Sequence, residues 1–250
     1  MQNEPAQEEF LIYGYHPVSE AIAKGKSIQK VILQSGEFEE HSKKMWHDLK
    51  GSGINIQRWP RQKLDRLVKG NHQGIVAFVS PVAFAELSNV VANAFDKGET
   101  PLLCWLDGVT DVRNVGAIMR SAAGFGVHGI ILPSKSGATL TADVVKSSAG
   151  AIYHIPLIQS KTTSDTLKEL GELGVFVTVI HEKTETEIAD ADMSNPTCLI
   201  MGDEGKGVSK EISDFADVEY KIPMKGEVAS LNVSVAAGVV FYEWFKRKAL

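Results

Sequence analysis

The chain has 250 residues, of which 44% are hydrophobic and 23% are charged, and its formal net charge is −5 at pH 7. This length allows one large domain or two smaller ones, and the composition is that of an ordinary globular protein. No window approaches the roughly 18 consecutive apolar residues of a membrane-spanning helix. The start, MQNEPAQEEF, lacks the basic and apolar regions of a signal peptide. We therefore expect a cytoplasmic protein with no membrane partner.

Residues 10–80 are expected to form a small α/β domain. Short apolar runs that predict strands alternate with helical stretches that begin at Pro17, near 37 and near 60. The predicted strands are 10–14, 29–34, 54–59 and 74–80. Residues 81–100 contain one further helical stretch, ELSNVVANAF, and are expected to form a linker.

Basic residues are concentrated in this first part of the chain. Residues 1–80 contain 11 Lys and Arg against 9 Asp and Glu, whereas residues 81–250 contain 15 against 22. A phosphate backbone is attracted by such local patches rather than by net charge, although a solvated helix face explains the same pattern. The segment 58–69 supplies five candidate phosphate contacts, namely Arg58, Arg61, Lys63, Arg66 and Lys69.

Residues 101–250 are expected to form a larger α/β domain. Continuous apolar runs separated by helical segments are typical of buried parallel strands. The predicted strands are 102–107, 129–132, 175–180 and 198–203, and the predicted helices lie around 114–125, 141–150, 162–173 and 231–248. The last helix is apolar over much of its circumference, so we expect it to be largely buried.

Three clusters of polar residues and glycine stand where these apolar runs meet helices: 114–120 (NVGAIMR), 201–207 (MGDEGKG) and 222–234 (IPM, then SLNVS). Ligands bind at such junctions because strand ends and helix N-termini present free backbone groups. Each residue also has an ordinary structural explanation. Asn114 would be the N-cap of the helix around 114–125, and Ser230 would be the N-cap of the last helix. Arg120 would be a surface arginine, and Glu204 would be part of a polar turn. Asn232, just inside an apolar helix, needs a partner for its amide.

Other patterns argue against competing functions. The GxGxxG of 124–129 ends a helix instead of opening one, so it predicts a glycine C-cap and not a dinucleotide site. The loop 202–209 lacks the order of a P-loop. No HExxH or CxxC spacing is present, so no metal site is expected. Cys104 and Cys198 lie in apolar runs and are expected to be reduced core residues.

Together the three clusters resemble the signature motifs of the SpoU, or TrmH, family of RNA ribose 2′-O-methyltransferases, which belongs to the SPOUT class. Asn114-x-Gly116-x-x-x-Arg120 resembles the first motif, Gly202-Asp-Glu204-Gly the second, and 222–234 the third. The resemblance covers about 101–248. The runs 13–21 and 71–77 resemble the small RNA-binding domain that precedes the catalytic domain in several members. These members include the enzymes that methylate a guanosine of large-subunit rRNA.

The resemblance implies an N-terminal RNA-binding domain (10–80) and a C-terminal parallel-sheet SPOUT domain (101–250) with a deep trefoil knot around 200–235. It also implies a homodimer, S-adenosylmethionine as the methyl donor and RNA as the partner. The implied donor-binding residues are Gly202, Ile222, Met224, Leu231, Thr178 and His181. The implied catalytic residues are Asn114, Arg120, Glu204, Ser230 and Asn232.

Physical chemistry limits the role of Arg120. A guanidinium is effectively always protonated, whereas it binds phosphate bidentately without changing its charge. We therefore expect Arg120 to hold the target phosphate rather than to act as a free base. Two alternatives stay open: a tRNA ribose methyltransferase and, less favoured, an inactive RNA-binding scaffold. A nucleotide-cofactor oxidoreductase is rejected because the chain has no correctly placed glycine fingerprint.

Overall fold

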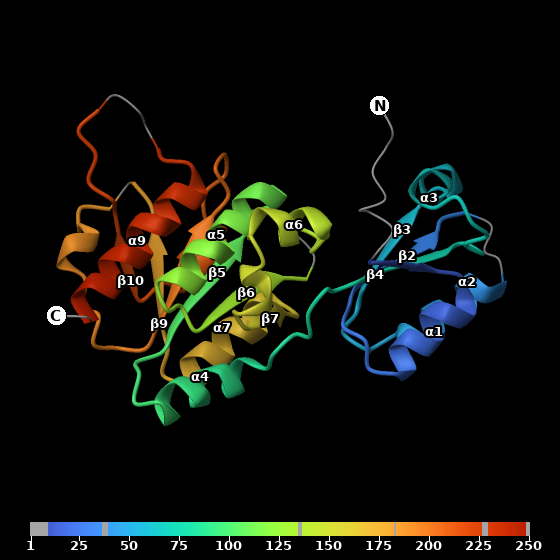
Figure 1. Cartoon of the computed structure of the whole chain (residues 1–250), viewed down its shortest axis with the longest axis horizontal. Helices are drawn as coiled ribbons and strands as arrows, with labels where there is room; N and C mark the ends of the chain where they lie inside the picture. Colours follow the sequence, from blue (N-terminus) through green and yellow to red (C-terminus); the bar gives the residue numbers. More distant parts are fainter. Residues whose placement is uncertain (1–9, 37–39, 135–136, 183, 227–229, 249–250) are drawn as a thin grey trace. The chain divides into compact units, whose positions relative to one another are not determined.

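The computed structural model describes residues 10–36, 40–134, 137–182, 184–226 and 230–248 (Figure 1). They fall into two compact units. The first contains the chain up to Ala83 and the short segment Thr139–Asp143, and the second contains Phe84–Ala138 and the chain from Val144 onward. Within the described ranges, no helix combines the length and the apolar character that crossing a membrane requires.

The first unit is built on a four-stranded sheet in the order β1-β4-β2-β3. Only β2 and β3 are parallel, and the other neighbours are antiparallel. Its strands are β1 (Leu11–Tyr13), β2 (Ile28–Gln34), β3 (Asn55–Trp59) and β4 (Ile75–Val79), and its helices are α1 (Tyr15–Ala23), α2 (Glu40–Leu49) and α3 (Arg61–Leu67).

Helices cover both faces of this sheet, because successive side chains of each strand point to opposite faces. The α1 and α2 helices pack Val18, Met45 and Leu49 against one face. The α3 helix packs Leu64 against the other face, and Val68, directly after the helix, joins it there. Figure 1 shows α3 on one side of the strands and α1 and α2 on the opposite side.

The second unit is built on a six-stranded sheet in the order β10-β8-β9-β5-β6-β7, and every neighbouring pair is parallel. The predicted parallel sheet is therefore confirmed. Two short strands, β7 and β10, were absent from the prediction. The strands are β5 (Leu102–Asp107), β6 (Gly129–Pro133), β7 (Leu157–Ser160), β8 (Phe176–Ile180), β9 (Thr197–Gly202) and β10 (Val218–Tyr220).

Helices also cover both faces of the larger sheet (Figure 1). On one face, α4 (Leu87–Asp96), α7 (Thr163–Glu172) and α8 (Lys210–Ser213) bury apolar side chains against Leu103, Trp105 and Ile200. The other face carries α5 (Val112–Gly124), α6 (Ala142–Ser147) and α9 (Val233–Lys248), with α9 packed along α5. Helical turns at Ala151–Tyr153 and Ile188–Asp190 complete the unit. The α4 helix, predicted within the linker, thus contributes Leu87, Val90 and Val91 to this core.

The ends of α5 differ in part from the prediction. Asp111, not Asn114, is the N-cap, because its carboxylate accepts hydrogen bonds from the backbone N–H groups of Arg113 and Asn114. Asn114 therefore lies in the first turn of the helix. The helix ends at Gly124 and Gly126 adopts a φ of 74°, so the predicted glycine turn is confirmed.

The expectation that α9 is largely buried was wrong. Val233, Ala237, Val240, Phe241 and Trp244 are buried, but a second apolar face is open. One side of α9 packs on α5, β9 and the helical turn Ile188–Asp190, whereas much of the opposite side stays open among the described residues. The exposed apolar side chains of α9 are Val235, Val239, Tyr242 and Phe245.

Both cysteines are free thiols with no measurable exposure. Cys104 on β5 and Cys198 on the neighbouring β9 are offset by one position in the parallel ladder. Burial raises the pKa of both thiols, which disfavours the reactive thiolate. Their placement agrees with the prediction of reduced core residues.

Gly116 of α5 is required by a close approach of α6. A Cβ atom added there would lie 1.9 Å from Ser147 Oγ and 2.7 Å from the backbone N of Ser148. We predict that Gly116→Ala destabilises the protein by about 1–3 kcal/mol, because one of the two helices must move. Gly124→Ala, in the same helix with no atom within 4 Å of the added Cβ, is the matched control and should lose nothing. Equal stability of the two variants in urea unfolding would contradict this account of Gly116.

Candidate active site

The residues of the three polar clusters meet in one hydrogen-bonded network at the carboxyl end of the large sheet. Asn114 Nδ2 donates to Glu204 Oε1 over 3.1 Å, and Asn232 Nδ2 donates to Asn114 Oδ1 over 3.1 Å. Asn232 Nδ2 also donates to Glu204 Oε1. These contacts join residues 90 and 118 positions apart in the chain. The fold thus brings Asn114, Glu204 and Asn232 together, as three clusters at strand–helix junctions would allow.

Asn232 has a second function as the N-cap of α9. Its Oδ1 accepts hydrogen bonds from the backbone N of Ser234 at 3.0 Å and of Val235 at 3.4 Å. The prediction of Ser230 as the N-cap was wrong, because α9 begins at Val233, two residues later than expected. The amide of Asn232 is satisfied on both sides, with Oδ1 bonded to α9 and Nδ2 to the network.

Glu204 is held in position by the tight loop that follows β9. Asp203 and Gly207 exchange both backbone hydrogen bonds, and Asp203 Oδ1 accepts from the backbone N of Gly205 and Lys206. A Cβ atom at Gly202 would lie 2.4 Å from the backbone of Gly207, so only glycine fits there. Glu204 Oε1 also accepts from the backbone N of Val233 at 3.3 Å. One carboxylate oxygen therefore links this loop to the start of α9.

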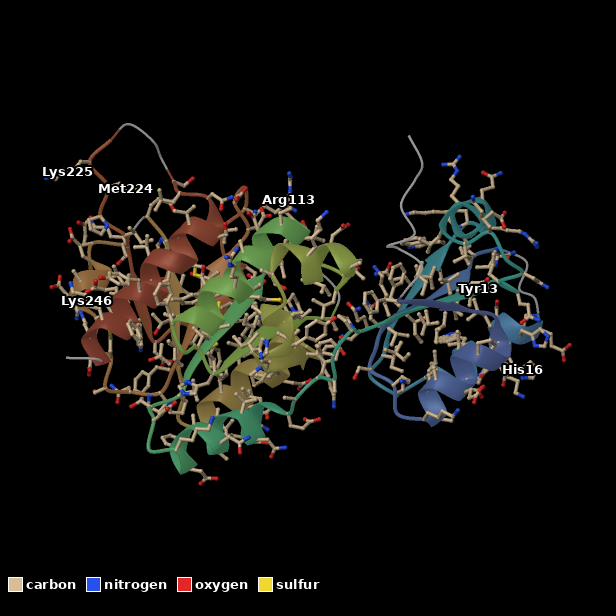
Figure 2. The ribbon with its side chains drawn as sticks, viewed as in Figure 1. Tyr13, His16, Arg113, Met224, Lys225 and Lys246 are labelled. Carbon is tan, nitrogen blue, oxygen red and sulfur yellow. The ribbon has the colours of Figure 1, made fainter. Side chains whose placement is uncertain are left out.

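Arg120 lies outside this network. It is exposed on α5, about 9 Å along the helix axis from Asn114, and makes no hydrogen bond or ion pair with other described residues. Arg113 is also exposed on α5 and pairs with Asp111 at 3.2 Å. The hydrogen bonds from Arg113 hold the pKa of Asp111 below its usual value. Figure 2 shows Arg113 projecting from the N-terminal end of the helix.

A cavity of about 410 Å³ opens beside Glu204. It lies at the carboxyl ends of β8 and β9, between the loop that follows β9 and the segment that precedes α9, as is common for ligands in α/β sheets. Apolar side chains, including Val179, Met201 and Leu231, form part of its wall. Carboxylates at Glu182, Asp203 and Glu204 are among the polar groups of the same wall.

Most of the residues predicted to bind the donor line this cavity. They are Gly202, Ile222, Met224, Leu231 and His181, and Ser230 lies beside them. Met224 belongs to the segment between β10 and α9, where Figure 2 labels it. Thr178 is buried on β8 and does not line the cavity.

Two acidic residues at the site escaped the prediction. Asp107 ends β5, and its Oδ2 accepts from the backbone N of Ser209, which fixes the far side of the loop after β9. Glu182 follows β8 in the cavity wall. Asp107 ends one predicted strand and Glu182 closely follows another. A position at the carboxyl end of a buried strand was the sequence feature that could have identified both residues as part of the site.

The strand alternation divides the candidate RNA-contacting residues. Arg58 lies on β3 opposite Leu33, and its guanidinium stacks over Trp46 of α2 at 5.3 Å. Lys63 lies on the other face, over the ring of Trp59 at 3.7 Å. Arg61 and Arg66 belong to α3, with Lys69 just after it. The sequence run 58–69 is therefore not one continuous surface.

In the part of the chain that the structure describes, no group of three His, Cys, Asp or Glu side chains is arranged as metal ligands would be.

Both units match known families. Residues 101–242 match the SpoU rRNA Methylase family, and residues 11–85 match the RNA 2′-O ribose methyltransferase substrate binding family. The α/β fold and the network at the sheet edge thus belong to a two-domain RNA methyltransferase. The chain is a member of the SpoU family.

Similar proteins support this membership. A relative from Bacillus subtilis (strain 168), YacO, is named for the TrmH family of tRNA/rRNA methyltransferases. It is 35% identical over 243 residues, which cover 97% of this chain and 98% of the relative. The SpoU methyltransferase AviRb of Streptomyces viridochromogenes, solved with AdoMet, has a TM-score of 0.62 and 22% identity over 96% of this chain and 90% of its own. The A. aeolicus TrmH/SpoU tRNA modifying enzyme has a TM-score of 0.55 and 28% identity, covering 60% of this chain and 77% of its own.

The double role of Asn232 gives a stability prediction. Asn232→Ala removes the cap of α9 and should cost about 0.5–2 kcal/mol, whereas Asn232→Ser keeps a capping oxygen and should cost clearly less. Ser230→Ala is the matched control and should change stability by less than about 0.5 kcal/mol, because Ser230 does not cap the helix. The measurement is urea unfolding of the three variants. A larger loss of unfolding free energy for Ser230→Ala than for Asn232→Ala would show that Ser230, and not Asn232, caps the helix.

Proposed function

We propose that this protein transfers a methyl group from S-adenosylmethionine to the 2′-hydroxyl of a ribose in rRNA, with a guanosine of large-subunit rRNA as the target. The observation that carries this proposal is the network of Asn114, Glu204 and Asn232 beside the cavity. Family membership supports the reaction class, and the resemblance of residues 13–21 and 71–77 supports the choice of rRNA. An inactive scaffold is disfavoured because Asn114, Arg120, Glu204 and Asn232 are all present.

The cavity fits the donor that the family implies. Its volume of about 410 Å³ lies in the range of small-molecule sites. Apolar walls suit an adenine ring, and the carboxylates of Glu182, Asp203 and Glu204 suit a molecule that carries a sulfonium and an ammonium group. Backbone near Gly202, Ile222 and Leu231 would hold the adenine. When bound, S-adenosylmethionine supplies a methyl group activated by the positive sulfur.

The residues of the chain must align the ribose oxygen and help to remove its proton. Arg120 is the candidate for binding the phosphate of the target nucleotide, because its guanidinium is exposed on α5 and remains charged. The bound phosphate is also the candidate relay for the hydroxyl proton on its way to solvent. Asn114 and Asn232 orient the ribose, and Glu204 fixes both amides. Ser230, at the cavity rim, supports the donor or the substrate.

The basic side chains of α3 would contact RNA phosphates. Arg61, Lys63 and Arg66 are exposed on this helix, and Lys69 follows it. Phosphate contacts set position and register rather than sequence. We assign the same role to Arg58, on the other face of the sheet.

A tRNA methyltransferase is the second candidate. Curated relatives carry the combined name tRNA/rRNA methyltransferase, and one structural neighbour is a tRNA modifying enzyme. The reaction and the site would be unchanged, and only the RNA bound by the N-terminal unit would differ. In either case we propose a cytoplasmic enzyme.

The proposed reaction is tested with labelled S-adenosylmethionine and separate pools of unmethylated rRNA and tRNA. We expect 2′-O-methylguanosine in large-subunit rRNA, identified by nucleoside analysis and mapped by primer extension. Incorporation of label into tRNA alone would show that tRNA, and not rRNA, is the substrate. A protein that binds the donor in calorimetry but labels neither pool would contradict the proposed activity on free RNA.

In the same assay, Arg120→Ala should lower the rate of methyl transfer by about 100-fold or more, because the target phosphate loses its anchor. Donor affinity should not change, since Arg120 does not line the cavity. Arg120→Lys keeps the charge but loses the bidentate geometry and should be intermediate. Arg113→Ala, which removes another exposed cation from α5, is the control. Full activity of Arg120→Ala would exclude this role.

We also propose that the protein is a homodimer and that the trefoil knot implied by the family forms around 200–235. The apolar face of α9 is the candidate interface, with Val235, Val239 and Tyr242 spaced at four and three residues on one side of the helix. Phe125, directly after α5, extends this surface, with its ring 5.8 Å from Tyr242 and 5.9 Å from Phe245. Exposed apolar patches of this kind mark association sites.

We predict that the double variant Val239→Lys, Tyr242→Lys has the mass of a single 27.2 kDa chain in light scattering, whereas the unmodified protein has twice that mass. Two buried lysines would leave unpaired charges in the interface. Lys168→Glu, at an exposed position of α7, is the control and should keep the larger mass. An unmodified protein with the mass of one chain would contradict the dimer itself.

A further inference from the structure

The α2 helix of the N-terminal unit carries a concentration of exposed basic and aromatic groups that the sequence analysis did not assign. His41, Lys43, Lys44 and His47 are exposed on it, against the acids Glu40 and Asp48. The buried side of the helix, with Ser42, Met45 and Leu49, faces the sheet. The outer side is therefore rich in cations and rings without being needed for the core.

One edge of α2 forms a stack of rings with the start of α1. The rings of Tyr15 and His41 are 5.3 Å apart and inclined by 27°, and His16 meets the edge of Tyr15 at 5.4 Å. Lys44 Nζ lies 5.0 Å from the centre of the Tyr15 ring. The hydrogen bond with Tyr15 raises the pKa of Lys44 above its usual value. Tyr15 is half-buried, whereas His16 and His41 are exposed.

The loop beside this stack is fixed by the backbone. Gln73 Oε1 accepts from the backbone N of Tyr15 at 2.9 Å, and Gly14 N donates to Ile75 O at 3.0 Å. Gly14 has a φ of 87°, which favours glycine. Figure 2 labels Tyr13 and His16 toward the end of the unit where α1 begins. The rings are thus presented on an ordered turn.

The opposite edge of α2 has a second pair of rings. Trp46 and His47 are 6.5 Å apart with planes inclined by 19°, and the Arg58 guanidinium lies over Trp46 at 5.3 Å. His41 and His47 are six residues apart, about 9 Å along the helix, so they can contact different bases. We use the term α2 face for His16, His41, Lys44, Trp46, His47 and Arg58.

The charge of the unit fits a polyanion. Residues 10–80 contain 11 Lys and Arg against 6 Asp and Glu. The α3 helix has basic residues too, but the adjacent ring is less available. Trp59 is partly buried against the α3 core, and Lys63 covers it. On the α2 face, by contrast, three histidine rings are exposed.

We propose that the α2 face binds unpaired nucleotides of the RNA substrate, with His16, His41 and His47 stacking on bases and Lys44 and Arg58 contacting phosphates. Bases can stack on side-chain rings only where they are not held in a duplex, so single strands and loops are the fitting partner. This inference rests on the proposed function for the identity of the partner as RNA. It assigns base contacts to the α2 face, beside the phosphate contacts already proposed for α3.

The test uses the full chain, a fluorescein-labelled oligoadenylate and a blunt RNA duplex of equal length, at about pH 8, where an ordinary histidine is neutral. The triple variant His16→Ala, His41→Ala, His47→Ala should bind oligoadenylate about tenfold or more weakly. The salt dependence of its affinity should stay the same, because the variant removes no lysine or arginine. Lys43→Glu with Lys44→Glu should instead reduce the salt dependence.

The matched control reverses charge on α3, with Arg61→Glu, Lys63→Glu and Arg66→Glu. This α3 variant should bind the duplex and oligoadenylate more weakly by similar factors. The histidine variant should lose affinity for oligoadenylate but not for the duplex. Undiminished oligoadenylate binding by the histidine variant, or equal losses for both RNAs, would overturn the proposal. His41→Phe keeps a ring and should retain the binding that His41→Ala loses, which separates stacking from misfolding.

Failure of the proposed function is visible separately. Binding is measured without methyl donor, and methyl transfer is measured in the assay described above. If the unmodified protein transfers no methyl group, but the histidine variant selectively loses affinity for oligoadenylate, the proposed activity is refuted and the α2 face is supported. If the unmodified protein methylates rRNA and the histidine variant binds oligoadenylate as tightly as the unmodified protein does, only the proposal for the α2 face is refuted.

Discussion

The candidate site depends on a single carboxylate oxygen. Glu204 Oε1 accepts from the side chains of Asn114 and Asn232 and from the backbone N of Val233. An ionised carboxylate oxygen can accept several hydrogen bonds at once, and such charge-assisted bonds are stronger than those between neutral groups. The start of α5, the loop after β9 and the start of α9 are therefore joined at one point. Neither α5 nor α9 can shift along the sheet without breaking contacts to this oxygen.

Parallel strands make this convergence possible. The carboxyl ends of β10, β8, β9 and β5 are neighbours, although these strands are distant in sequence. Three of these ends deliver ionisable side chains to the same edge. The β5 end supplies Asp107, the β8 end leads to His181 and Glu182, and the β9 end leads to Glu204. A parallel sheet with helical connections thus concentrates chemistry without requiring adjacent residues in the chain.

Much of the framework could be predicted from the sequence, and the failures have physical reasons. Long apolar runs identified β5, β8 and β9, whereas β7 and β10 have only four and three residues and lack that signal. Asn114, Glu204 and Asn232 were nominated by their positions after apolar runs and by family resemblance. Their mutual hydrogen bonds were not predictable, because they depend on how distant strands align. The basic run 58–69 was predicted to supply five phosphate contacts. Strand alternation in β3 turns Arg58 and Trp59 to opposite faces, and Lys63 of α3 lies over Trp59.

The two hydrogen-bonding roles of Asn232 restrict which side chains can replace it. Serine and threonine can cap a helix but offer no amide N–H₂ to Glu204. Aspartate can cap as well, but it would bring a second negative charge against the Glu204 carboxylate. Glutamine carries the amide on a longer side chain, which is a poor match to the cap geometry. A substitution at position 232 therefore changes the stability of α9 and the geometry of the site together.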